Sequence, residues 1–163
     1  MDYASGGNPK LNEWQFDELI SANQMFYNCQ KLHTVIFPDK INLTKATDLS
    51  SMFKDCFALK GGFNGLVNLY DENKSTSSLS LSSMFSNCKS LTDVGTIISA
   101  NMFRVNNIES LFENCTELTT LDLSKWAFNE NTTLSLSKVF AGCSKLEDLK
   151  LPEMKVSSLT AAF

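Results

Sequence analysis

The sequence predicts an α/β repeat solenoid, a right-handed coil in which short helices alternate with short parallel strands. Three observations lead to this fold class: a motif that occurs five times, a helical apolar stripe in each copy, and an alternating apolar pattern after each copy. The motif is an apolar residue, Phe, two variable residues, Cys, two variable residues and Leu. It contains every cysteine of the 163-residue chain, at steps of 27, 32, 27 and 28 residues. A period of that size is typical of proteins built from stacked repeats.

Each motif belongs to an apolar stripe with helical spacing. In the second copy the stripe occupies positions i, i+3, i+4, i+7 and i+10, as Leu49, Met52, Phe53, Cys56 and Leu59. These positions share one face of an α-helix, so we expect one short amphipathic helix in every repeat. Serines suited to be helix N-caps precede three of the motifs, as Ser50, Ser82 and Ser137. Helices this short need neighbouring repeats to be stable.

The apolar period changes to two after each motif. Residues 118–123 and 146–151 both have the pattern Leu-x-x-Leu-x-Leu, and residues 32–37 follow it closely. This pattern is typical of the strand in leucine-rich repeats. A second apolar segment before the motif, for example Leu134 and Leu136, indicates a further short strand. Because the elements return in the same order, we expect the strands of successive repeats to be parallel.

The chain divides into three predicted regions. We expect a disordered leader over residues 1–8 and an N-terminal capping helix over residues 9–24, with Trp14 laid over the first repeat. Residues 25–163 are predicted to form a leucine-rich-repeat-like solenoid of about five coils. No polar cap follows Phe163. We therefore expect an array that is truncated at its C-terminus, or one that self-associates through this uncapped edge.

Composition excludes several classes of partner. The net charge is −4 and the pI is about 5.0, which disfavours a nucleic-acid partner. No apolar run approaches the roughly 18 residues that cross a bilayer, so we expect no direct membrane insertion. The N-terminal residues lack the apolar core of a signal peptide, so we expect either a cytosolic protein or an export signal that lies outside this sequence.

The side chains that could act as nucleophiles, bases or metal ligands do not form a catalytic pattern. The five cysteines recur at one place on the apolar stripe, so we expect buried free thiols that act as small hydrophobic side chains. No two of them have the spacing of a zinc site. The only histidine, His33, has no partner nucleophile or acid at a suggestive spacing. We predict no enzyme activity, no metal and no cofactor.

The remaining candidate is the outward face of the predicted strands, a row of short polar and charged side chains that suits a protein or an extended peptide. The alternative interpretation is that this face of the sheet is only exposed to solvent and binds no partner. The candidate partner-binding residues are His33, Thr34, Ile36, Lys60, Phe63, Thr92, Asp93, Thr119, Asp122, Glu147, Asp148 and Lys150.

The repeated Met-Phe-x-x-Cys-x-x-Leu-x-x-Leu-x-Leu pattern, with Ser-Ser or Ser-Lys before it, resembles the BspA-like leucine-rich-repeat proteins of bacterial surfaces. The likeness extends over residues 20–163. It implies an extracellular or cell-surface bacterial protein whose repeats work as an adhesion module. The implied partners are host extracellular or matrix proteins, or other cell-surface proteins. The alternative is a structural spacer, a stalk of repeats without a ligand of its own.

Overall fold

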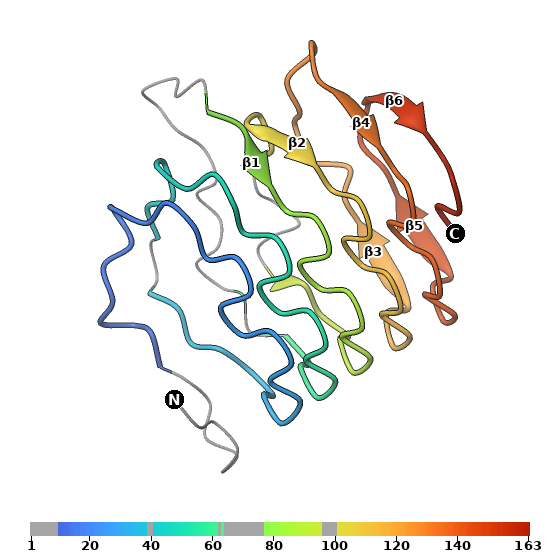
Figure 1. The fold of residues 1–163 in the computed structure, drawn as a ribbon. Helices are drawn as coiled ribbons and strands as arrows, with labels where there is room; N and C mark the ends of the chain where they lie inside the picture. Colours follow the sequence, from blue (N-terminus) through green and yellow to red (C-terminus); the bar gives the residue numbers. More distant parts are fainter. Residues whose placement is uncertain (1–9, 39–40, 62, 64–76, 96–100) are drawn as a thin grey trace.

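The fold consists of short parallel strand pairs joined by turns (Figure 1). The computed structural model describes residues 10–38, 41–61, 63, 77–95 and 101–163. The named strands are β1 Leu79–Ser80, β2 Val105–Asn107, β3 Thr120–Asp122, β4 Thr133–Ser135, β5 Asp148–Lys150 and β6 Lys155–Ser158. They form three two-stranded parallel sheets, with strand pairs β1–β2, β3–β5 and β4–β6.

Strand pairing joins each repeat to the next one along the chain. In the β3–β5 pair, Leu121 lies opposite Leu149, and both belong to the predicted Leu-x-x-Leu-x-Leu segments. Isolated parallel bridges continue this pairing toward the N-terminus, between Lys10 and Ile36, Ser21 and Asp48, Thr34 and Gly61, and Asp48 and Ser80. Figure 1 shows the repeats side by side, in chain order from blue to red. The strand expected around Leu134 is present as β4.

The predicted α/β solenoid is nevertheless wrong. The described part of the chain contains no helix, and therefore none long and apolar enough to cross a membrane. Its strands form separate pairs in a small β-rich domain, not an alternation of strands and helices. The capping helix expected over residues 9–24 is also wrong, because residues 10–24 form turns and isolated bridges. The predicted leader, residues 1–8, lies outside the described residues.

Left-handed backbone conformations explain why the motif does not form a helix. Each repeat has two residues with positive φ, one located two positions before the motif Phe and one two positions after it. An α-helix cannot accommodate them, because L-residues in this conformation interrupt the right-handed path. These residues are Gln24 and Asn28, Ser51 and Asp55, Ser83 and Asn87, Ser110 and Asn114, and Lys138 and Gly142.

The backbone hydrogen bonds of the motif alternate between two directions. The N–H groups of Ser51, Phe53 and Asp55 each donate to a carbonyl of the following repeat at 2.9 Å. The N–H of Cys56, by contrast, donates three residues back to the Phe53 carbonyl at 3.1 Å. Three of these four donors are thus satisfied by the neighbouring repeat. Since a buried unpaired N–H is costly, one repeat cannot keep this conformation without the next.

The serines expected as helix N-caps have a different role. The N–H of Ser50 donates to Oδ1 of Asp48 at 2.8 Å, which closes a local side-chain turn ahead of the motif. The same turn forms in later repeats, from Ser82 to Ser80, from Glu109 to Asn107 and from Ser137 to Ser135. A small oxygen-bearing residue five positions before the motif Phe therefore sets the entry into the turns.

The motif phenylalanines form a continuous stack through the interior. Neighbouring rings have centroids 5.4–6.2 Å apart and are tilted by 3–21°, the offset geometry that aromatic pairs favour. Phe53, Phe85 and Phe112 are at most 1% exposed. The stack contains Phe26, Phe53, Phe85, Phe112, Phe140 and Phe163.

Arg104 is a buried cation that joins three repeats. Its guanidinium donates to the carbonyl oxygens of Leu43 at 3.2 Å, Ala46 at 2.6 Å and Ser77 at 3.0 Å. The side chain is only 7% exposed. Several charge-assisted hydrogen bonds compensate for its removal from water, so Arg104 fixes the positions of these loops relative to one another.

Candidate functional site

Nearly all of the predicted strand-face residues lie on the surface. His33, Lys60, Thr92 and Asp93 are exposed, as are Thr119, Asp122, Glu147, Asp148 and Lys150. Thr34 is half-buried, and Ile36 is 45% exposed. We call these eleven residues the strand face.

Phe63 does not belong to this face, and its prediction as a binding residue is wrong. The side chain is fully buried, with its ring centroid 5.3 Å from that of Phe53 and 4.9 Å from that of Phe85. A large aromatic ring gains more by packing between two stacked phenylalanines than by facing water.

Backbone hydrogen bonds arrange the strand face into two rows. In the first row the N–H of Lys60 donates to His33, and the N–H of Thr92 donates to Lys60, at 3.0 and 3.2 Å. In the second row the N–H of Glu147 donates to Thr119 at 2.9 Å. Successive side chains therefore come from successive repeats, on a backbone whose positions are fixed by pairing.

Gly61 lets the first row pass close to the next repeat. A Cβ built at Gly61 would lie 3.0 Å from the backbone oxygen of Asp93, which is tighter than most such contacts. Glycine, which has no Cβ, thus permits this close approach of two backbones. Asp93 itself is anchored, since its Oδ1 accepts the Gly95 N–H at 2.7 Å.

One carboxylate of the second row is already neutralised. Asp122 accepts hydrogen bonds from the Ser124 hydroxyl at 2.6 Å and the Ser124 N–H at 3.0 Å, and it pairs with Lys150 at 3.2 Å. The bonds from Ser124, with help from Lys150, lower the pKa of Asp122 to about 2. The hydrogen bond to Asp122 in turn raises the pKa of Lys150. Among the residues that the structure describes, Asp93, Glu147 and Asp148 are the strand-face carboxylates outside the ion pairs, although the charge of Asp148 also helps to raise the pKa of Lys150.

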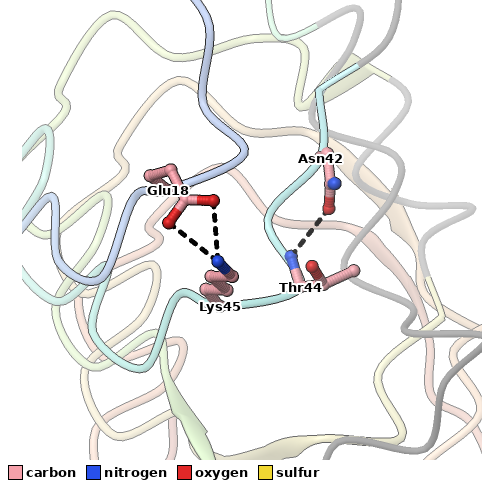
Figure 2. A network of polar contacts seen from close by, with 4 residues as sticks. All are labelled: Glu18, Asn42, Thr44 and Lys45. Carbon is pink, nitrogen blue, oxygen red and sulfur yellow. Dashed lines mark hydrogen bonds and ion pairs between the residues drawn. The ribbon is translucent and has the colours of Figure 1, made fainter.

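A polar network near the N-terminal end has no comparable organisation. Lys45 donates to both carboxylate oxygens of Glu18 at 2.7 Å, and the Thr44 N–H donates to Asn42 at 3.1 Å (Figure 2). The Lys45 and Glu18 side chains are 55% and 83% exposed. Ion pairs this exposed contribute little to the stability of a protein. We therefore interpret this network as ordinary surface contacts of the first two repeats.

A row of polar side chains lies on the turn side of the repeats, the side formed by the turns of the Phe-x-x-Cys motif. The strand pattern of the sequence did not predict this row. Asn87 donates to Asp55 at 2.6 Å, and Asn114 donates to Asn87 at 2.8 Å. At the next repeat a Cβ on Gly142 would collide with the Asn114 side-chain oxygen, and the backbone there has a positive φ, which together explain the glycine. The signal was an Asn, Asp or Gly two positions after each motif Phe, the residue types that tolerate positive φ.

The cysteines form a row beside the phenylalanines and remain thiols. All five are free, as predicted; Cys56, Cys88 and Cys115 are buried, while Cys29 and Cys143 are partly buried. Four thiols donate to the Phe carbonyl of the preceding repeat at 3.0–3.1 Å.

Burial makes these thiols poor nucleophiles. Desolvation raises the pKa of Cys56 to about 12 and the pKa of Cys115 well above its usual value. A nucleophilic cysteine needs a lowered pKa and access to solvent, and the buried thiols lack both. Within the described residues, no group of three or more His, Cys, Asp or Glu side chains could hold a metal ion.

Comparison with known proteins identifies a family. The model of a family described as "Mycoplasma protein of unknown function, DUF285" matches residues 2–66 and 79–162, which is most of the chain. The chain therefore belongs to this family. No curated protein and no solved structure gives a significant match.

Proposed function

We propose that this DUF285 family member is a non-catalytic protein-interaction module of a bacterial cell-surface or secreted protein, and that it attaches to host or matrix proteins through its strand face. The observation that carries the proposal is the arrangement of that face. Its exposed side chains come from consecutive repeats whose backbones are hydrogen-bonded to one another. Binding residues on such a preorganised scaffold lose little conformational freedom when a partner binds.

The charge pattern indicates which part of the face makes the polar contacts. Lys60, His33 and Asp93 lie in the first row, and Glu147 and Asp148 lie in the second; within the described residues the carboxylates of Asp93, Glu147 and Asp148 form no ion pair. A partner with basic groups spaced to meet these carboxylates would gain complementary contacts, which favour specificity and fast association. Ile36, 45% exposed in the first row, adds an apolar contact.

The resemblance of the motif to BspA-like surface proteins supports the adhesive role. The repeated Met-Phe-x-x-Cys motif carries this resemblance. A location at the cell surface rests on the same resemblance. It is tested by antibody labelling and protease treatment of intact cells that express the protein, since an internal protein would be neither labelled nor cleaved.

A binding experiment tests the proposed face. Immobilised fibronectin, laminin and collagen serve as probes, and the binding of purified protein is followed by surface plasmon resonance. We expect saturable binding to at least one probe that a triple variant, Asp93→Lys, Glu147→Lys and Asp148→Lys, lowers by roughly tenfold or more. A matched control reverses three exposed acids elsewhere, Asp17→Lys, Glu109→Lys and Glu130→Lys, and should retain binding.

The two variants separate the outcomes. Equal loss in both would show a nonspecific effect of net charge, and full binding by the strand-face variant would refute the proposed face. Failure of the wild-type protein to bind any probe would favour the alternative role as a structural spacer.

A further inference from the structure

Four Asn-x-Ser/Thr tripeptides occur in the chain, and the function proposed above uses none of them. They begin at Asn42, Asn73, Asn114 and Asn131. This tripeptide, the sequon, is the acceptor pattern for N-linked glycosylation, in which a transferase attaches a sugar to Nδ2 of the Asn. Asn73 lies outside the described residues. The structure places the other three asparagines in two different kinds of surroundings.

The sequon at Asn42 lies at the surface, between the motifs of the first and second repeats. Asn42 is exposed, and its Oδ1 accepts the Thr44 N–H at 3.1 Å (Figure 2). Because only the oxygen of the amide can accept this bond, Nδ2 occupies the other side of the amide group. Nδ2 forms no hydrogen bond within the described part of the chain. Leu43, which is 2% exposed, anchors the tripeptide to the core, so the atom that carries a sugar is held at the surface.

The sequon at Asn131 is accessible as well. Asn131 is exposed in the turn that precedes β4, and its side chain forms no hydrogen bond with any described residue. Its backbone N–H donates to Oδ1 of Asn129 at 2.8 Å, which orders the turn. Thr133, the first residue of β4, is also exposed. Both ends of this sequon, the Asn and the Thr, are therefore open to an enzyme.

Asn114 has the same sequence pattern in surroundings that oppose modification. Its Nδ2 donates to Oδ1 of Asn87 in the preceding repeat at 2.8 Å. The middle residue of this sequon, Cys115, is fully buried, and Gly142 of the next repeat lies close to the Asn114 amide. A transferase must bind the amide and move it out of these contacts, which costs the hydrogen bond to Asn87. The fold therefore blocks this sequon.

We propose that Asn42 and Asn131 are acceptor sites for N-linked sugars and that Asn114 is not. The reaction is the transfer of a sugar from a nucleotide-activated donor by a glycosyltransferase. A bond forms between Nδ2 and the anomeric carbon of the sugar as the bond from that carbon to the phosphate oxygen breaks. The nucleoside diphosphate leaves with the electron pair, and one Nδ2 proton passes to a base of the transferase. Neither site belongs to the strand face, so the proposal does not depend on the proposed function.

Mass spectrometry of the protein isolated from the cells that produce it tests the proposal. Trypsin places the three asparagines on separate peptides, and fragmentation locates the sugar on each peptide. We expect a glycan on Asn42 and on Asn131 and none on Asn114. Thr44→Val removes the hydroxyl of the sequon but keeps the N–H that bonds to Asn42, and it should abolish the glycan at Asn42 alone. Thr119→Val, at an exposed threonine outside any sequon, is the matched control and should leave both glycans in place.

A second measurement shows whether the fold sets this selectivity. The purified 163-residue protein is incubated with UDP-glucose and a soluble glycosyltransferase that modifies the Asn of sequons. The folded protein should gain glucose at Asn42 and Asn131, whereas a synthetic peptide of residues 105–125 should gain it at Asn114. Unmodified Asn42 and Asn131 in the protein from its own cells would overturn the proposal, and so would glucose on Asn114 of the folded protein.

Discussion

The turn side and the strand face of the repeats follow opposite rules. On the turn side the same residue types recur in register: the stacked phenylalanines, the thiols behind them, and Asn, Asp or Gly at the second positive-φ position. On the strand face the residue types change from repeat to repeat, from Lys60 to Thr92 and from Thr119 to Glu147. Repetition therefore marks residues that packing and backbone conformation require, and variation marks residues that these two requirements leave unconstrained.

The largest effect should come from the turn side. Phe112→Ala removes a fully buried ring stacked between Phe85 and Phe140, and we expect it to lower the free energy of unfolding by about 3–5 kcal/mol. Phe103→Ala is the matched control, because Phe103 is 50% exposed. Urea denaturation gives both values. Equal losses for the two variants would contradict the assignment of Phe112 to the core.

The thiols should make stability fall at alkaline pH. The pKa of Cys56 is raised to about 12 in the folded protein, above its usual value of 9.0. Between these values the folded state binds more protons than the unfolded state, so stability is complete below pH 9 and decreases as pH rises above it. We expect Cys56→Ala to lose less stability than the wild type between pH 9 and pH 10, by about 1 kcal/mol. Urea titrations at the two pH values measure this difference, and identical losses would show that the thiol ionises freely.

The smallest effect should come from the strand face. Thr119 is exposed and takes part in the repeat-to-repeat pairing through its backbone carbonyl. Thr119→Ala should change the free energy of unfolding by less than about 0.5 kcal/mol. A large loss in the same urea assay would mean that this face is used for stability, and the contrast between the two sides would fail.

The apolar pattern predicted which side chains are inside but not the path of the backbone. Four members of the predicted stripe, Leu49, Met52, Phe53 and Cys56, are at most 2% exposed, although they do not lie on a helix. Two left-handed residues per repeat turn the chain so that the same spacing still points inward. The recurring Asn, Asp or Gly after the motif Phe was the available signal, because these residues favour positive φ.

Long-range contacts account for the remaining errors. Arg104 donates to carbonyls of residues 58 and 61 positions earlier in the chain, and no local pattern predicts such a contact. Phe63 occupied an outward position in the strand pattern, but it packs between rings of two different repeats. The other strand-face residues were placed correctly near the surface because alternation within a paired strand is a local property.

The central claim is that the motif folds as left-handed turns bonded to the next repeat. Scalar coupling across hydrogen bonds, measured by NMR on isotope-labelled protein, tests it at Phe53. We predict a coupling between the amide nitrogen of Phe53 and the carbonyl carbon of Met84, whose hydrogen bond is 2.9 Å long. A coupling from Phe53 to the carbonyl of Leu49, four residues back as in an α-helix, would contradict the account.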